Sequence, residues 1–318
     1  MLKFAKYRKI YFIFSGILIV VSVLVLFFFG LKPGIDFTGG SILELEYKDL
    51  RPSNQEILEK LQGLDLGTIY VQPTGEKGVI IRMKDITEET HQQILQTLRQ
   101  ETEFVPKEEG SGEGALNIKL GAVEERRFET IGPVIGRELK RKTKVVIAVA
   151  LLSMILYIAL AFRRVQRPLR SWVYGIASVI ALFHDILIPL GIFAVLGKFY
   201  NVEITIPVIT ALLAVLGYSI NNTVVVFDRI RENLLKRGES FEEVVDVSLN
   251  QTLARQINTS LTTLFVAGAI FFLGGETLKY FALALILGIG AGTYSSIFLA
   301  SPLLVFWYRL KLKKFSDS

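Results

Sequence analysis

Residues 217–233 read Gly-Tyr-Ser-Ile-Asn-Asn-Thr-Val-Val-Val-Phe-Asp-Arg-Ile-Arg-Glu-Asn, and this stretch decides the fold class. Two adjacent amides, Asn221 and Asn222, lie inside an apolar run that ends abruptly at the charged residues 228–232. Polar groups inside a bilayer are costly, and they usually face a protein interior or a wet pathway. The stretch therefore predicts a membrane helix that does more than anchor the chain.

The composition of the whole chain also indicates a membrane protein. Of 318 residues, 51% are apolar, and the mean hydropathy is +0.45. The absence of cysteine excludes disulfides, thiolate metal sites and a cysteine nucleophile. The two histidines, His91 and His184, are far apart in sequence and suggest no metal site. The net charge of +6 does not indicate nucleic-acid binding, because the Lys and Arg residues gather at the ends of apolar runs, where they set membrane topology.

Six apolar runs are long enough to cross roughly 30 Å of hydrocarbon. They are residues 10–31, 145–162, 171–197, 204–227, 257–275 and 280–308. The first run lacks a small-residue cleavage site, so we expect an uncleaved anchor rather than a signal peptide. Basic clusters precede the first run and follow the second, fourth and sixth, which predicts that both termini lie in the cytoplasm.

The polar segment between the first two spans reads as a separate α+β domain outside the membrane. Its predicted order is strand 42–47, helix 54–61 with Ser53 as N-cap, strands 68–71 and 79–83, helix 87–98 and strand 116–120. This order is that of a ferredoxin-like unit. His91 falls on the polar side of its helix, and we expect it to be exposed.

The chain is therefore expected to be a polytopic α-helical membrane protein with one extracytoplasmic domain. The predicted parts are a cytoplasmic N-terminus (1–9), a first span (10–31), an outer domain (32–141), a five-helix membrane domain (142–308) with a cytoplasmic loop (228–256), and a cytoplasmic tail (309–318). Residues 241–253 of that loop have the pattern of an amphipathic helix on the membrane surface, which is either solvated or a docking surface for a partner.

Motifs of enzymes are missing from the sequence. It has no G-x-x-x-x-G-K-[ST] phosphate loop, no H-E-x-x-H and no G-x-S-x-G, so we expect neither an enzyme nor an ATP-driven motor, and no cofactor or metal. The glycines at 288, 290 and 292 form a small-residue stripe, which favours close helix packing over a ligand role.

Asp185 is the one acid at the middle of a predicted span. An acid in hydrocarbon favours its neutral form and can take up or release a proton as local wetting changes. The alternative is a neutral, hydrogen-bonded residue that only locks two helices together. Arg255 lies at the predicted cytoplasmic end of the fifth span, and from composition alone we interpret it as a positive-inside anchor.

A second block, Gly34-Ile-Asp-Phe-Thr-Gly-Gly40, follows the first apolar run. Together with residues 217–233, it resembles the SecF family of bacterial protein-export subunits, and the resemblance covers essentially the whole chain. In this block Asp36 is able to cap a turn, and the paired glycines allow positive φ, so we expect a rigid junction. The residues that match the family motifs are Gly34, Asp36, Gly39, Gly40, Gly217, Asn221, Asp228, Arg229, Arg231, Glu232 and Asn233.

The resemblance implies half of a resistance-nodulation-division (RND) type transporter that works with the paralogous SecD subunit. With the SecYEG channel, and indirectly with SecA, it would assist preproteins across the cytoplasmic membrane. It would use the proton-motive force after the ATP-dependent step. YajC and YidC are further implied partners, nucleic acid is not, and a thylakoid membrane is a second location if the source is photosynthetic.

The resemblance also associates proton conduction with Arg255 and with an acid in the preceding span. This sequence departs from the family pattern there, because Asn222 stands where the family commonly has the acid. An amide cannot titrate, so proton movement would need Asp185, a partner's acid or water chains. Two other functions stay open: half of an RND-type exporter of small molecules or lipids, and a subunit that only stabilises the translocation complex.

Overall fold

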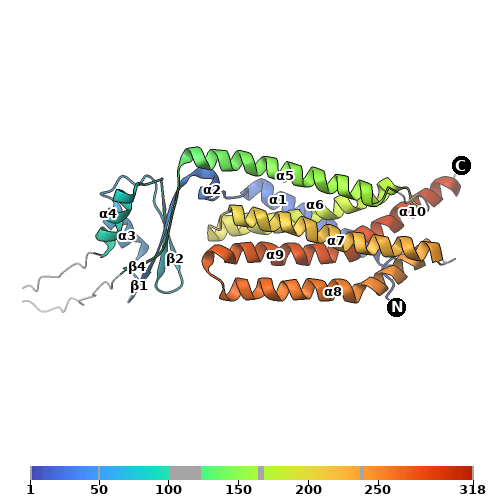
Figure 1. Cartoon of the computed structure of the whole chain (residues 1–318). Coiled ribbons are helices and arrows are strands. Elements are labelled where there is room, and N and C mark those ends of the chain that lie inside the picture. Colours follow the sequence, from blue (N-terminus) through green and yellow to red (C-terminus); the bar gives the residue numbers. More distant parts are fainter. Residues whose placement is uncertain (1, 49–50, 100–122, 164–167, 237–239, 317–318) are drawn as a thin grey trace, which may run out of the picture. The chain divides into compact units, whose positions relative to one another are not determined.

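The computed structural model describes residues 2–48, 51–99, 123–163, 168–236 and 240–316 (Figure 1). The chain divides into two compact units. One comprises Met1–Lys32 and Thr143–Ser318, and the other comprises Pro33–Lys142. They are the membrane unit and the polar unit below.

Long apolar helices build the membrane unit, and the described residues contain six of membrane-spanning length. They are α1 (Arg8–Phe29), α5 (Pro133–Ala161), α6 (Ser171–Tyr200), α7 (Ile206–Lys236), α8 (Phe241–Leu273), and a last span made of α9 (Glu276–Ser295), the π-helical η1 (Ser296–Ala300) and α10 (Ser301–Ser316). All six predicted spans are confirmed. Both termini lie at the same end of this bundle (Figure 1), as an even number of crossings requires.

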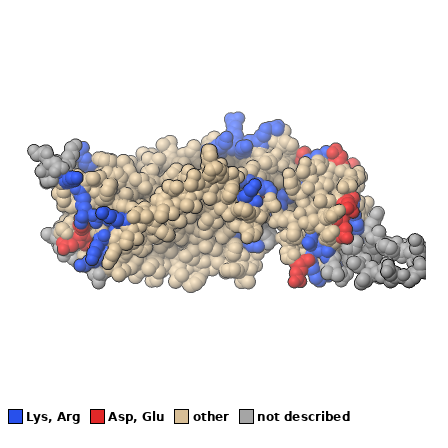
Figure 2. All heavy atoms as spheres, turned by 180° about the vertical axis from the view of Figure 1, so that it is seen from behind, with Lys and Arg blue, Asp and Glu red and all other residues tan. Residues whose placement is uncertain are grey.

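Charge is distributed along the bundle as a bilayer requires. On the face shown in Figure 2, a broad band of uncharged atoms covers the helical part, and Lys and Arg gather beyond it. Helix α5 is exposed over nearly all of its apolar length, whereas half of the apolar window of α6 is buried. The inner helices therefore carry the packed core, and α5 offers its surface to lipid or a partner.

The helix predicted at residues 241–253 is present, but it is not a separate surface helix. These residues form the first part of α8, which continues to Leu273 without a helix breaker. Ser240 and Glu243 form a capping box at its start. Its apolar face is buried within the chain itself, where Phe241 packs on Tyr308 at 4.7 Å between ring centroids. The main-chain N–H of Ala5 donates to Asp246 Oδ1 at 2.8 Å, so the N-terminal segment covers this part of α8.

The glycine stripe of the last span packs as predicted. A Cβ atom at Gly288 would lie 2.5 Å from Val215 of α7, and one at Gly292 would lie 3.0 Å from Ser219 Cβ. Gly290 faces the other way, with nothing within 4 Å of such an atom. Two of the three glycines therefore let α9 approach α7 closely.

The polar unit has a four-stranded antiparallel sheet in the order β2-β3-β1-β4. The strands are β1 (Gly40–Tyr47), β2 (Tyr70–Thr74), β3 (Gly78–Met83) and β4 (Val123–Ile131), and the helices are α2 (Ile35–Thr38), α3 (Asn54–Leu61) and α4 (Glu88–Arg99). The element order confirms the ferredoxin-like prediction. The core lies between the sheet and helices α3 and α4, and Ser53 caps α3 as predicted, within a capping box.

Two details of the polar unit differ from prediction. The predicted strand 116–120 lies outside the described residues. The last strand observed is β4, which was not predicted because its Glu and Arg residues obscure the alternating apolar pattern of a strand. His91 was predicted to be exposed but is buried, with 4% of its surface accessible. Its ring stacks on Phe128 of β4 at 3.8 Å and lies within 3.3 Å of the Glu88 and Glu125 carboxylates, which shield it from solvent. Hydrogen bonds from Gln92 and then from His91 lower the pKa of Glu88.

The paired glycines 39 and 40 adopt the positive φ values that were expected, +75° and +130°. A Cβ atom at Gly39 would lie 3.0 Å from Pro133 Cα, and one at Gly40 would lie 2.8 Å from the Met83 carbonyl oxygen. Only glycine fits both the conformation and the space. Asp36 lies in the first turn of α2, whose N-cap is Gly34 without a side-chain cap.

The glycine stripe offers a matched test of helix packing. Gly288→Ala should destabilise the bundle by about 1–3 kcal/mol, the usual cost of overpacking, because α9 must move away from α7. Gly290→Ala adds the same methyl group where there is room, so thermal melting of the detergent-solubilised protein should be unchanged. Equal melting temperatures for the two variants would contradict this packing.

Candidate functional site

Asp185 is completely buried in the membrane unit, with 0% of its side chain accessible. It lies on α6, which contacts α1, α7 and α9 and buries residues on several sides. An ionised carboxylate accepts hydrogen bonds and donates none. The surrounding side chains must therefore supply donors if the acid is to be charged in this position.

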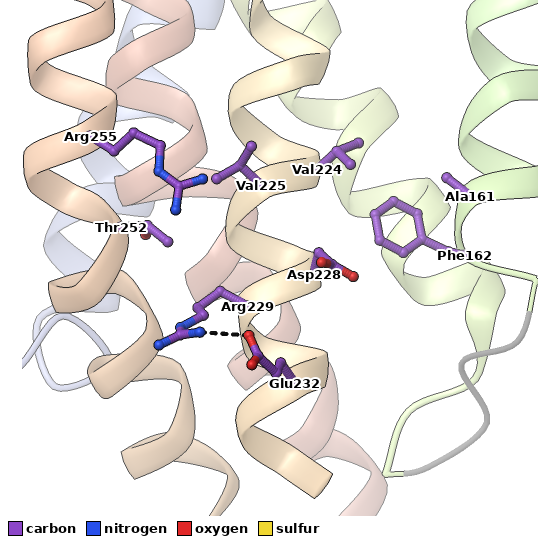
Figure 3. Close-up of a pocket in the computed structure, with 9 residues that line it drawn as sticks. All are labelled: Ala161, Phe162, Val224, Val225, Asp228, Arg229, Glu232, Thr252 and Arg255. Atoms are coloured by element: carbon purple, nitrogen blue, oxygen red, sulfur yellow. Dashed lines mark hydrogen bonds and ion pairs between the residues drawn. The ribbon is translucent and has the colours of Figure 1, made fainter. Parts of the chain in front are cut away.

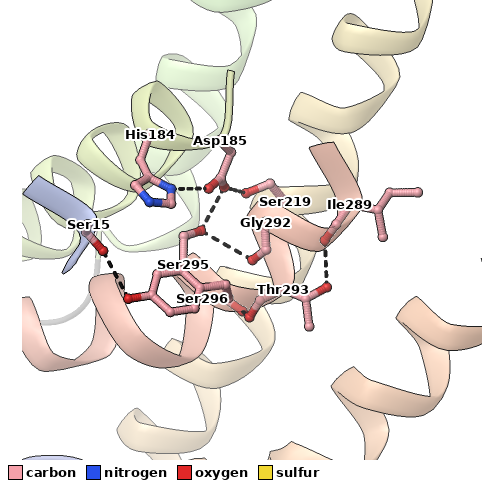
Figure 4. Close-up of polar contacts among 10 residues, drawn as sticks. Ser15, His184, Asp185, Ser219, Ile289, Gly292, Thr293, Ser295 and Ser296 are labelled. Atoms are coloured by element: carbon pink, nitrogen blue, oxygen red, sulfur yellow. Dashed lines mark hydrogen bonds and ion pairs between the residues drawn. The ribbon is translucent and has the colours of Figure 1, made fainter. Parts of the chain in front are cut away.

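Three polar side chains from three helices converge on the Asp185 carboxylate (Figure 4). His184 Nδ1, on the same helix, lies 2.9 Å from Oδ1. Ser219 of α7 and Ser295 of α9 both donate to Oδ2, Ser295 at 2.7 Å. No Lys or Arg contacts the carboxylate in the described parts of the chain. The arrangement ties α6, α7 and α9 together at one buried carboxylate.

His184 is as deeply buried as its neighbour. Consecutive helix residues normally point about 100° apart and do not face each other, so packing from other helices holds the pair together. The Tyr294 ring stacks against the imidazole at 5.8 Å, and Ser15 of α1 donates to the Tyr294 hydroxyl at 3.3 Å. Among the described residues, His184 Nε2 has no hydrogen-bond partner.

A π-helical turn begins directly after Ser295 and turns the next serine toward another helix. Ser296 donates to Gln256 Oε1 of α8 at 2.7 Å, and Gln256 Nε2 lies 3.5 Å from Thr252 Oγ1. Ser301 donates to the Ser296 carbonyl at 3.0 Å. Such turns are rare and are often found at functional sites. Adjacent serines therefore join the Asp185 cluster to a second buried polar group.

Thr252 also lines a cavity of about 250 Å³ beside the charged end of α7 (Figure 3). Arg229 donates to Glu232 at 2.5 Å, and Asp228 pairs with Arg231 at 3.1 Å. The residues that line the cavity are Ala161, Phe162, Val224, Val225, Asp228, Arg229, Glu232, Thr252 and Arg255. Buried polar side chains thus lead from Asp185 toward this charged cavity.

The structure does not bring the three sequence-predicted coupling residues together. Asn222 is buried in α7 with its Nδ2 atom unpartnered, and Arg255 is exposed on α8. No hydrogen bond or ion pair joins either of them to Asp185 within the described ranges. Of the motif residues, Gly217 and Asn221 are exposed, whereas Asn233 is buried. Asn233 Nδ2 donates to Ser248 at 2.8 Å and to Gln251 at 2.9 Å, so this residue ties α7 to α8.

Sequence reasoning missed the partners of Asp185. They are His184, Ser219 and Ser295, with Ser296 and Gln256 beyond them. Hydroxyls are common in apolar helices, because they can bond to the main chain of their own helix. Only Ser219 lay in a stretch already singled out. The available signal was the group of serines in the last apolar run, Ser295, Ser296 and Ser301.

These features define a multi-pass membrane protein whose described residues hold six membrane-spanning helices, one polar unit and a buried acid. Residues 114–310 match the family "Protein export membrane protein SecD/SecF, C-terminal", and residues 24–49 match the SecD/SecF GG motif. The first match covers more than half of the chain, so the chain belongs to the SecD/SecF family of protein-export membrane proteins.

Relatives that match nearly the whole length are SecF subunits. Protein translocase subunit SecF of Thermobaculum terrenum is 40% identical, over 96% of this chain and 94% of its own length. The SecF subunit of Desulfurispirillum indicum is 38% identical, over 92% and 87%. The crystal structure of SecDF, a translocon-associated membrane protein from a Thermus species, matches with a TM-score of 0.76 and 32% identity. That match covers 97% of this chain but only 39% of the SecDF chain. The chain is a Sec translocase subunit.

The three-donor arrangement predicts a difference between two substitutions of the buried acid. Asp185→Asn keeps the shape and one acceptor oxygen, so the protein should melt close to the wild type. Asp185→Ala leaves the donors without an acceptor, at about 1–3 kcal/mol for each one. Its melting temperature in detergent should fall clearly. If Asp185→Ala melts at the same temperature as Asp185→Asn, the hydrogen bonds to the carboxylate do not stabilise the bundle.

Proposed function

We propose that the chain works beside a SecYEG channel with a SecD-like partner and uses the proton-motive force to complete preprotein translocation after the SecA step. Asp185 is its titrating group. The observation that carries the proposal is a fully buried carboxylate whose partners, among the described residues, are neutral or titratable groups from three helices. Without a fixed cation beside it, such an acid is able to change its protonation state.

Protonation of Asp185 would change the contacts between helices. The ionised form accepts from Ser219 on α7 and Ser295 on α9, whereas the neutral form must donate one hydrogen bond of its own. Either His184 Nδ1 becomes the acceptor of that bond and the ring changes its tautomer, or one of the serine contacts rearranges. Because closely packed helices have few alternative arrangements, a local change of this kind is able to shift a helix. In the proposed cycle, the shift biases the polar unit between a pose that holds the emerging preprotein and one that releases it.

The cytoplasmic end of the proposed route is the charged cavity. Arg255 lies at its wall and lacks a side-chain partner in the described part of the chain, so its guanidinium is available to a carboxylate or to water. Asn222 orients water or a neighbouring group but does not ionise. The membrane orientation is inferred from the positive-inside rule: both termini lie in the cytoplasm. The membrane is the inner membrane, or a thylakoid membrane if the source is photosynthetic.

A partner is expected because α8 exposes polar residues along a membrane-spanning helix. Asn258, Thr259 and Thr262 are exposed one or two turns beyond Arg255. Polar side chains at this depth are usually covered by protein or water. The chain spans about two fifths of the solved SecDF chains, and a SecD-like half is the mate that fits. YajC, YidC and SecA would act further from this surface.

A purely structural role is the second candidate, because the hydrogen bonds of Asp185 also lock three helices and because Asn222 replaces the acid of the family. In that case the chain would stabilise the complex without coupling of its own. Substitutions that keep the packing but remove titration separate the two roles.

We expect Asp185→Asn to assemble normally but to lose the proton-dependent stage of export. Arg255→Lys keeps the charge but loses the planar donor fork, so it should weaken coupling. Asn222→Asp restores the usual acid and should be tolerated or raise coupling. The measurement is export of a slow-folding preprotein with and without an uncoupler. If Asp185→Asn exports as well as the wild type, the coupling role belongs to the partner.

Purification of the tagged full chain in mild detergent should recover a SecD-like chain. A double substitution, Asn258→Leu with Thr262→Leu, should reduce this recovery, because it removes polar groups from the exposed face of α8. Phe265→Leu on the same face keeps an apolar side chain and serves as the control. A lone monomer that is stable and active in export would contradict the partner proposal.

A further inference from the structure

His184 has no assigned role, although it is a titratable residue with 0% of its side chain accessible at the centre of the membrane unit. One ring nitrogen, Nδ1, lies 2.9 Å from the Asp185 carboxylate. The other, Nε2, is buried and has no hydrogen-bond partner among the described residues. A buried polar atom without a partner normally costs about 1–3 kcal/mol, so its retention calls for an explanation.

We infer that His184 is the residue through which Asp185 gains its proton, with Nε2 as the nitrogen that takes the proton up. The inference rests on the proposed function in taking Asp185 as the titrating group. Histidine suits this role, because its unperturbed charge change falls between pH 5 and 8 and its two nitrogens can hand a proton from one side of the ring to the other. A carboxylate alone has no such second face.

Over one cycle the pair takes one proton from water at Nε2 and releases one proton to water from Asp185. At the start, the neutral ring carries its proton on Nδ1 and donates to ionised Asp185, so the pair has a charge of −1. A proton that binds Nε2 gives an imidazolium beside the carboxylate, with no net charge. Transfer of the Nδ1 proton to Oδ1 then leaves a neutral ring with its proton on Nε2 and a neutral acid. Release of the acid's proton returns the charge to −1, and the ring recovers its first tautomer when the proton on Nε2 is exchanged for one on Nδ1.

The surroundings favour this exchange over a fixed ion pair. From α9, the Tyr294 ring stacks on the imidazole and Ser295 donates to Oδ2; from α7, Ser219 also donates to Oδ2; from α1, Ser15 bonds to the Tyr294 hydroxyl. Among the described residues, the titratable group in contact with the His184–Asp185 pair is therefore Tyr294, and no Lys or Arg contacts the pair. Nothing in direct contact holds either residue of the pair in its charged form permanently.

A purely structural role of residue 184 would not require a histidine side chain. If His184 only donated a hydrogen bond to Asp185, an asparagine amide at the same position could supply that donor and leave no second nitrogen unpartnered. His184→Asn is therefore the informative substitution, because it keeps a donor near Oδ1 and removes the nitrogen that takes up the proton.

The test uses the full chain in lipid nanodiscs. The sequence has only two histidines, so ¹⁵N-histidine labelling gives the Nδ1 and Nε2 signals of two rings, and His91→Asn assigns them. The carboxyl band of Asp185 in infrared difference spectra across pH is assigned with Asp185→Asn. We expect the His184 ring to change its protonation or tautomer over the same pH range as the Asp185 band. Residues that share a proton titrate as one system.

Substitutions then separate coupling from packing. His184→Asn should move the midpoint of the Asp185 band by about one pH unit or more, the size of shift that marks interacting sites. It should also reduce export to the level measured with an uncoupler. The controls, His91→Asn and Tyr294→Phe, should leave the Asp185 band in place, since the first is in the polar unit and the second keeps the stacked ring.

Two results would overturn the inference. One is a wild-type His184 ring that keeps a single state while Asp185 titrates, which needs no variant to measure. The other is an Asp185 band that titrates identically in His184→Asn. The spectra do not depend on export. If His184 and Asp185 titrate together but the uncoupler does not reduce export, the proposed function is refuted and the His184 inference is not.

Discussion

The hydrogen bonds to the Asp185 carboxylate are the interaction on which the membrane unit depends. A charge in a low-dielectric interior is tolerated only when its surroundings supply enough donors. Here the donors come from α6, α7 and α9, so the positions of these three helices are set together. Gly292 is part of the same constraint, because its missing side chain lets α9 approach Ser219 closely enough for both serines to reach one oxygen atom.

The π-helical turn extends this cluster toward the cavity that Thr252 lines. Ser295 is the last residue of α9 and Ser296 is the first residue of the π-helical turn, and each of these adjacent serines has a buried partner. Ser295 reaches α6 and Ser296 reaches Gln256 on α8. The last span thus contacts both the proposed titrating group and the helix that carries Arg255. A rearrangement at Asp185 has a direct physical connection to the helix whose polar face is exposed.

Much of this architecture could be predicted from the sequence, because the hydrophobic runs and the strand–helix alternation are local signals. Asp185 was identified for the same reason, as an acid inside an apolar run. The continuity of α8 was missed, since the apolar face of residues 241–253 is buried by the distant N-terminal segment. The burial of His91 was missed because its cover, Phe128, comes from a strand that reads as charged. No local sequence signal identifies Ser219 and Ser295 as partners of Asp185, because only tertiary packing brings them to the acid.

Proton flux through reconstituted proteoliposomes tests the central claim most directly. The chain and its SecD-like partner would be reconstituted with a translocation channel and a stalled preprotein, with a pH-sensitive dye inside the vesicles and an imposed pH gradient. The account predicts flux in the wild type that falls to the background of empty vesicles in Asp185→Asn, with the complex still assembled. Undiminished flux in that variant would contradict the claim that Asp185 is the titrating group.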